Sequence, residues 1–268
     1  MMNFKPLERI KDRIYSSRGE SDSAYFYDLI SYAEMVVKYV ALFLVASLED
    51  DVDRTRYRFE YRLVRADGIG DFAQCISEII TGSAADFLPQ TVADNERIEL
   101  QSKKTHSSWQ ETALLKLQEC LSKLDIEGNS VTQKSNLLIW FSNIALLRNK
   151  TKGHGNITAS QCSEVCIILE ESIDAIVNNL SVFRRPWAYL HQNINGKYRV
   201  SLFSGDGAAF DHLKKTIGYT YDNGVYCFID RVKVVHLCYS DESLSHFSLV
   251  NGNFSASEKF EIIDYVTT

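Results

Sequence analysis

The 36 residues between Glu127 and Glu164 contain no carboxylate. At the frequency of acidic residues in the whole chain, 35 in 268, about five would be expected there. The same segment holds four cations, which are Lys134, Arg148, Lys150 and Lys152. Three of them fall within five residues. A cation near the end of a helix interacts favourably with the helix dipole, so an ordinary solvated helix end would also explain this charge.

Residues 148–155 read Arg-Asn-Lys-Thr-Lys-Gly-His-Gly and combine several groups that could do chemistry together. The guanidinium of Arg148 is always charged, and its planar fork matches phosphate oxygens. The imidazole of His154 is the natural proton-transfer group near neutral pH. Glycines on both sides of His154 permit a ligand to approach the backbone closely. The string therefore favours proton transfer beside a bound anion over a histidine packed in a core.

Helices are predicted on both sides of this string from apolar residues at helical spacing. The first predicted helix begins near Ala24, with Asp22 or Ser23 as its cap. The second covers residues 72–80, after Gly68 and Gly70, and the third covers residues 106–124. The fourth begins at a Ser135 cap. A fifth helix starts at the capping-box pattern Thr158-Ala159-Ser160-Gln161 and runs to Leu180. The charged residues 50–62 are interpreted as a polar connection, and Pro89 as the end of a helical block.

The last third of the chain contains all three Asn-Gly pairs, at residues 195–196, 223–224 and 251–252. Asn-Gly is a strong hairpin signal because both residues tolerate a positive φ. The pairs lie among β-rich runs at residues 198–203, 225–229, 232–239 and 260–266. The predicted fold is therefore α+β, with a helical domain over residues 1–182 and a small, mostly antiparallel β domain over residues 183–268. We place the boundary near Pro186.

Composition narrows the class of protein. Hydrophobic residues make up 45% of the chain and charged residues 24%, which excludes wholesale disorder. The net charge of −6 excludes a basic coat over the whole surface but not a local basic site. The most apolar run, residues 35–48, is interrupted by Lys38, and what remains is too short to cross a bilayer. Residues 1–18 lack the apolar core of a signal peptide. We expect a cytoplasmic protein without membrane contact.

Neither a metal nor a cofactor is expected. Among the six cysteines only Cys162 and Cys166 are close in sequence, and no partner pair lies at zinc-finger spacing, which favours buried thiols in a reducing compartment. The acidic run 49–53 lacks the glycine and distal glutamate of a calcium loop. The glycine-rich residues 204–207 lack the lysine of a phosphate-binding loop. These two segments are interpreted as a helix end and a turn.

The string from Arg148 and Asn149 to His154 resembles the motif of the HEPN superfamily. That motif is an arginine, a polar residue that is often asparagine, a few more positions and then a histidine, and it joins the last two helices of a small bundle. Five residues separate Arg148 from His154 here, within the range of four to six usual for the family. The long helix with Glu34 and Lys38 and the helix after the motif are also similar to the family. The resemblance covers roughly residues 20–182.

The resemblance implies a metal-independent endoribonuclease whose active site forms at a two-fold dimer interface. His154 would act as general base on the ribose 2′-hydroxyl or protonate the departing 5′-oxygen, and Arg148 would stabilise charge on the scissile phosphate. Asn149 would orient phosphate or histidine. Lys150 and Lys152 would bind flanking RNA phosphates. One histidine cannot easily be both base and acid, and a homodimer would supply two copies. Kinship alone implies a defence or toxin role.

Two points limit what the resemblance implies. In family members that a nucleotidyltransferase partner silences, a tyrosine follows the histidine by two positions, whereas this chain has Asn156. This difference disfavours silencing by a nucleotidyltransferase and leaves a regulatory protein partner of another kind open. The alternative function is a non-catalytic module that binds RNA or a protein, with the β domain as recognition surface. The aromatic residues of the last third favour a sheet core over base stacking.

Overall fold

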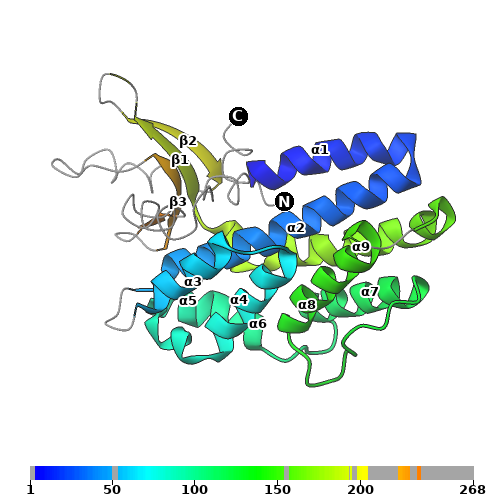
Figure 1. Ribbon diagram of the computed structural model, residues 1–268, viewed down its shortest axis with the longest axis horizontal. Helices are drawn as coiled ribbons and strands as arrows, with labels where there is room; N and C mark the ends of the chain where they lie inside the picture. The colour runs from blue at the N-terminus through cyan, green and yellow to red at the C-terminus, as the bar shows by residue number, and fades with distance from the viewer. Residues whose placement is uncertain are drawn as a thin grey trace.

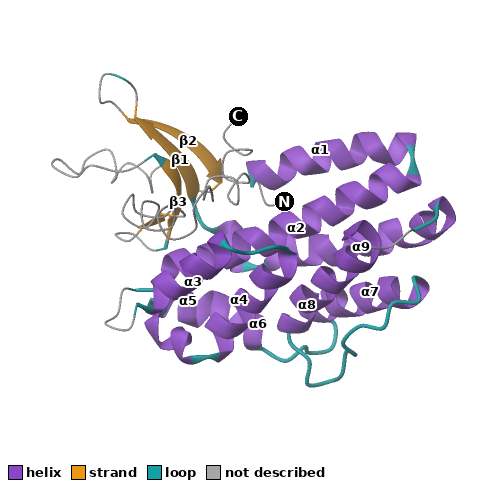
Figure 2. Ribbon diagram, in the orientation of Figure 1, coloured by secondary structure: helices purple, strands orange, loops and turns teal. Residues whose placement is uncertain are grey.

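The computed structural model describes residues 4–49, 54–153, 157–192, 194, 198–204, 223–229 and 234–236. Helices occupy the chain up to residue 184 and a small antiparallel sheet follows, so the α+β prediction is confirmed (Figures 1 and 2). The α-helices are α1 (Lys5–Glu20), α2 (Asp22–Ser47), α3 (Thr55–Val64), α4 (Ile69–Thr81), α5 (Gln90–Val92), α6 (Ile98–Gln101), α7 (Trp109–Lys123), α8 (Leu138–Arg148) and α9 (Ala159–Asn179). Tighter or wider turns are η1 (Ser83–Phe87), η2 (Ala93–Arg97), η3 (Asn149–Gly153) and η4 (Ser181–Arg184). The strands are β1 (Trp187–Gln192), β2 (Tyr198–Ser204), β3 (Gly224–Phe228) and β4 (Val234–His236).

Helix α2 is the central element, and α1, α4, α8 and α9 pack around it. It begins where Ser21 accepts a hydrogen bond from the backbone of Ala24, one residue before the predicted caps. Its length and composition would also suit a membrane span, but 83% of its most apolar window is buried inside the protein. It is the one helix of that kind in the described part of the chain. Its apolar character on nearly all sides thus follows from its place in the core.

Two amphipathic helices were not predicted. Residues 55–64 form α3 instead of a polar connection, because Phe59, Leu63 and Val64 give it a buried face. Helix α1 covers a segment to which the sequence assigned no element, and its Leu7, Ile10 and Ile14 are buried against the core. In α1 charged residues outnumber apolar ones, and in α3 the two kinds alternate, which hides the helical period.

The predicted helix boundaries had mixed outcomes. The capping box at Thr158 is confirmed, since its side chain accepts from the backbone of Gln161 and the Gln161 side chain accepts in return. Ser135 caps no helix: its hydroxyl accepts from the backbone of Thr132, and α8 begins three residues later at Leu138. Pro89 closes no block either, because it precedes the continuous run of α5, η2 and α6.

The sheet has the strand order β2-β1-β3-β4, and all its pairings are antiparallel. Strands β1 and β2 flank the Asn-Gly pair at 195–196, although β1 itself was not predicted. The prediction of a hairpin at 223–224 is wrong, because β3 pairs with β1 and β4 and not with the preceding β2. The pair at 251–252 and the run 260–266 lie outside the described residues.

One face of the sheet shares its apolar core with the helices. The Trp187 ring lies 5.5–6.0 Å from the rings of Phe4, Tyr39 and Phe43. Alternate residues of β1 and β3, among them Ala188 and Tyr226, belong to a second cluster, as the period of two in a strand requires. Secondary structure therefore changes around Pro186 while the core continues across it. The division into two domains stays a prediction.

Candidate active site at the end of α8

Arg148 is the last residue of α8, and its side chain points to the central helix α2. The Arg148 Nε–H donates to Oε1 of Glu34 at 2.8 Å, and its Nη1 donates to Oδ1 of Asn149 at 3.2 Å. The guanidinium is thus oriented by a carboxylate from one helix and an amide from its own chain neighbour. A hydrogen bond to a charged group of this kind contributes about 1.5–3 kcal/mol when it is shielded from water.

Lys152 joins the same carboxylate from the following turn. Its Nζ donates to Oε2 of Glu34 at 3.2 Å. The two oxygens of Glu34 therefore bridge Arg148 and Lys152. The side chain of Glu34 is 16% exposed, whereas those of Arg148 and Lys152 are 30% and 39% exposed. The cations are thus reachable from solvent while their common anchor is largely shielded.

The backbone between these cations is a π turn, η3, that widens the end of α8. Residues four apart lie on the same face of a helix, which places Lys152 above Arg148. The hydroxyl of buried Thr151 donates to the carbonyl of Leu147 at 2.8 Å and ties the turn to the helix. Such single wide turns are frequent at functional sites.

The structure describes four of the five predicted site residues. Arg148, Asn149 and Lys152 lie together around Glu34. Lys150 is exposed in the same turn. His154 lies outside the described residues, between η3 and the start of α9, so its proximity to Arg148 stays a prediction.

Glu34 is the residue whose position sequence reasoning missed. It was named only together with Lys38, as part of the long helix that is similar to the family, yet it pairs with Arg148 and Lys152 on other elements. Lys38 lies one turn further along α2, with its Nζ 5.7 Å from the ring centroid of Phe72. A signal was present, because Glu34 is the single acid between Asp28 and Glu49, and the acid-free segment needs a counter-charge from elsewhere.

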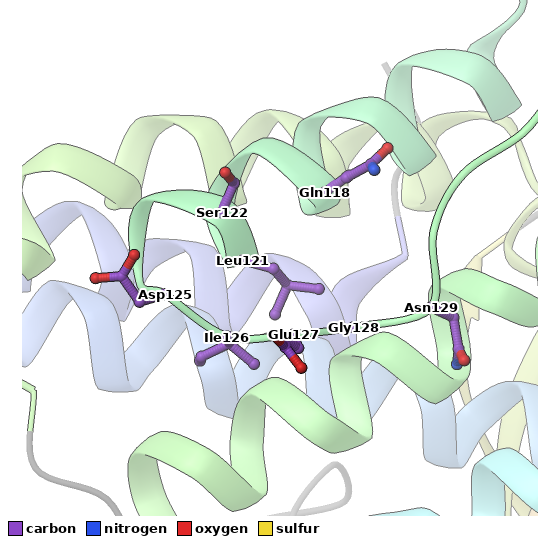
Figure 3. Close-up of a pocket in the computed structure, with 8 residues that line it drawn as sticks. All are labelled: Gln118, Leu121, Ser122, Asp125, Ile126, Glu127, Gly128 and Asn129. Carbon is purple, nitrogen blue, oxygen red and sulfur yellow. The ribbon is translucent and has the colours of Figure 1, made fainter.

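A hollow of about 380 Å³ lies between the end of α7 and the loop that follows it (Figure 3). It is lined by Gln118, Leu121, Ser122, Asp125, Ile126, Glu127, Gly128 and Asn129. No predicted site residue lines it. The carboxylates of Asp125 and Glu127 would repel a phosphate, so this hollow does not suit the predicted chemistry.

The described cysteines, at positions 75, 120, 162, 166 and 227, are all buried. Burial raises the pKa of Cys120 and Cys166 to about 12. These two residues are therefore neutral thiols at physiological pH, without the thiolate that nucleophilic catalysis needs.

The cluster at the end of α8 can bind an anion. Arg148, Lys150 and Lys152 set three positive charges against the single carboxylate of Glu34. No family model matches the chain, and no curated protein and no solved structure is significantly similar to it. The case for a function therefore depends on the residues themselves and on the resemblance that their spacing carries.

Proposed function

We propose that the protein is a metal-independent endoribonuclease that cleaves single-stranded RNA. The observation that carries the proposal is the bridge in which Glu34 holds Arg148 and Lys152 side by side, directly before His154 in the sequence. A guanidinium fixed in this way costs little reorganisation when charge develops on a phosphate.

The proposed reaction is an internal transfer at phosphorus. The 2′-oxygen of the ribose attacks the phosphorus as its proton passes to a base, and the bond to the 5′-oxygen breaks as that oxygen receives a proton. The products are a 2′,3′-cyclic phosphate and a 5′-hydroxyl. His154 of one subunit serves as base and His154 of a second as acid, so the active species is a homodimer. Each positioned proton-transfer group accelerates the reaction by about 10²–10⁴.

The remaining residues have supporting roles. Arg148 stabilises the charge on the phosphate oxygens, and Asn149 keeps the guanidinium aimed through its 3.2 Å hydrogen bond. Lys150 and Lys152 bind neighbouring phosphates without reading sequence. The proposed substrate is cellular RNA, so the proposed place of action is the cytoplasm. The proposed biological role is in defence or as a toxin.

The test is a cleavage assay on total cellular RNA with analysis of the new ends. We expect cyclic phosphate ends in the presence of EDTA, resistance of substrates with 2′-deoxyribose at the cut, and loss of cleavage in His154→Ala and Arg148→Ala. His106→Ala is the matched control, because His106 has a side chain 97% exposed on a loop before α7.

Cleavage that continues unaltered in His154→Ala would refute the assignment. RNA that is bound but never shortened, over a range of protein concentrations, would instead favour a non-catalytic binding module.

A further inference from the structure

Helix α3 carries a concentration of arginine that the rest of the chain does not. Residues 54–65 hold five arginines and one glutamate, a net charge of +4 in a chain whose total is −6. The glutamate, Glu60, is buried and accepts from Nε of Arg56 at 2.8 Å.

Four of these five arginines divide into two groups, and the fifth, Arg54, is exposed just before the first turn of α3. Arg56 and Arg62 are half-buried and pair with Glu60 and Glu78, which gives them a structural role. Arg58 and Arg65 are exposed, and neither forms an ion pair with a carboxylate of the described residues. An exposed guanidinium without an internal carboxylate keeps its full attraction for an external anion.

Arg65 also completes a stack of planar groups. The rings of Tyr57 and Tyr61, one turn apart, have centroids 6.3 Å apart and an angle of 24° between their planes. The guanidinium of Arg65 lies 5.4 Å from the Tyr61 centroid, and its Nη1 donates to the Tyr61 hydroxyl at 2.6 Å. Two rings and a guanidinium thus follow one another along the helix, with the charged group at the end nearer α4.

This surface and the candidate active site lie on elements that share a contact with α2. Helix α4 begins soon after Arg65, and both α3 and α4 pack against α2 (Figure 1). Phe72, in the first turn of α4, lies under Lys38 of α2, and Lys38 is one turn from Glu34. The helix that precedes Arg65, the helix that follows it and the candidate active site thus all lie against α2.

We propose that Arg58, Tyr61 and Arg65 form a second binding surface for single-stranded RNA, outside the site of cleavage. Arg58 binds a backbone phosphate, and an unpaired base stacks on the Arg65 guanidinium and so extends the stack that begins at Tyr57. The choice of RNA as ligand rests on the proposed function, whereas the phosphate and stacking chemistry does not. A strand that occupies both surfaces would be held along its length and not only at the cut.

The experiment measures binding without cleavage. A fluorescein-labelled 20-nucleotide 2′-O-methyl uridine strand cannot be cut by 2′-hydroxyl attack, so its fluorescence anisotropy reports binding alone. We expect Arg58→Ala/Arg65→Ala to weaken binding about tenfold or more, since each base stacked on a planar side chain contributes about 1–3 kcal/mol. The slope of log affinity against log salt should become shallower by about 0.7, because Arg58 makes one phosphate contact and each such contact on a single strand contributes about 0.7.

The matched control is Lys5→Ala/Arg9→Ala, which removes two exposed cations one turn apart on α1 and should leave the affinity unchanged. Arg58→Ala alone provides a second, milder variant if the double variant unfolds. The proposal fails if either α3 variant binds like the wild type, if the wild type does not bind the strand, or if it binds a duplex equally well. Because the probe is uncleavable, these results stand whether or not the protein cleaves RNA.

Discussion

Glu34 accepts from Arg148 with one carboxylate oxygen and from Lys152 with the other. In Glu34→Gln the side chain keeps its shape but loses its charge, and one of its two acceptors becomes a donor that repels a cation. We expect kcat for RNA cleavage to fall about tenfold, which corresponds to about 1.4 kcal/mol of lost transition-state stabilisation. Initial rates at saturating RNA measure this effect.

Glu171→Gln is the control for Glu34→Gln, because Glu171 pairs with Lys116 at 2.8 Å in a half-exposed position on α9. Glu171→Gln should change the free energy of unfolding by less than about 1 kcal/mol, as is usual for ion pairs open to solvent. Glu34→Gln should lower it by about 1.5–3 kcal/mol, because the Glu34 carboxylate is largely shielded. An unchanged kcat in Glu34→Gln would show that the bridge does not position Arg148.

Tyr39 and Tyr32 lie on the same helix and differ in whether the hydroxyl has a partner. Both rings are fully buried, but the Tyr39 hydroxyl has no hydrogen-bond partner among the described residues. The Tyr32 hydroxyl donates to Asp174 at 3.3 Å. We expect Tyr39→Phe to raise the free energy of unfolding by about 1 kcal/mol, since it removes an unsatisfied buried group, and Tyr32→Phe to lower it by a similar amount. Urea denaturation checks the sign of both changes. A clear loss of stability in Tyr39→Phe would indicate that the Tyr39 hydroxyl has a hydrogen-bond partner.

The sequence predicted the hydrogen bonds of a residue correctly where the partners are close neighbours in the chain. The Thr158 capping box depends on four consecutive residues, and it formed as predicted. Ser135 shows the limit, because an equally local hydrogen bond to Thr132 competed for its hydroxyl. The proximity of Arg148 and Lys152 follows from helical spacing. Their pairing with Glu34 requires the packing of α8 on α2, and the spacing of residues along the chain does not predict that packing.

At the scale of elements, the loop after α7 is clamped to α8 through Asn143. The buried Asn143 amide accepts from the backbone N–H of Asn129 and donates to its carbonyl. Gly128 lies beside this clamp, and a Cβ there would stand 2.7 Å from Cδ1 of Leu121 and 3.1 Å from Oδ1 of Asn143. We expect Gly128→Ala to lower the free energy of unfolding by about 1–3 kcal/mol, the usual cost of overpacking.

Gly19→Ala is the control for Gly128→Ala. Gly19 lies in the last turn of α1, and a Cβ there would meet no atom within 4 Å. Alanine is favoured over glycine in a helix by about 0.5–1 kcal/mol, so this variant should be more stable than the wild type. Thermal unfolding of the two variants should shift in opposite directions. A stabilised Gly128→Ala would mean that Leu121 moves aside without cost.

The elements that sequence reasoning missed share a physical cause. Helices α1 and α3 have narrow apolar faces between many charges, and only packing against α2 turns those faces into a core. Strand β1 likewise contains Trp187 and Leu190, which are buried on opposite faces, so its pattern lacks a simple alternation of polar and apolar residues. The order of strands in the sheet depends on contacts between distant segments, and the Asn-Gly pair at 223–224 could not reveal it.

At the scale of the whole molecule, buried tyrosines predict a loss of stability in alkali. Burial raises the pKa of Tyr25, Tyr32 and Tyr39, and hydrogen bonds to Glu170 and Asp174 raise it further in the first two. In the unfolded chain tyrosine ionises near pH 10, so above that pH the unfolded state releases protons that the folded state keeps. The free energy of unfolding should therefore fall steeply above about pH 10. A smaller fall should begin near pH 8.5, because Cys120 and Cys166 ionise there in the unfolded chain but stay protonated in the folded protein.

Urea titrations at each pH measure this alkaline loss. Tyr32→Phe should reduce the slope of stability against pH, whereas Tyr15→Phe should not, because Tyr15 is 58% exposed. An equal slope in all three proteins would contradict the assignment to buried tyrosines.

Arg185 connects the sheet to the helices through a buried ion pair. Its Nε and Nη2 donate to the two oxygens of Glu96 at 2.5 and 2.7 Å, and its other donors reach the carbonyls of Thr91 and Ile229. Glu96 is 1% exposed, so removal of the guanidinium leaves a carboxylate buried without its partner. We expect Arg185→Met to lower the free energy of unfolding by about 3–5 kcal/mol.

The double variant Arg185→Met/Glu96→Leu should lose less than Arg185→Met, because it removes both charges together. Arg185→Lys should not restore stability, since one ammonium cannot replace a fork that donates to both oxygens of Glu96. The neighbouring Arg184→Met is the control: Arg184 pairs with Glu99 at 3.1 Å but is 56% exposed, so its loss should cost less than about 1 kcal/mol. Guanidinium denaturation gives the four values, and hydrogen exchange of the β1 amides shows whether the sheet separates from the helices first. Equal losses in Arg185→Met and Arg184→Met would mean that the apolar contacts of Trp187 hold the sheet without help from the ion pair.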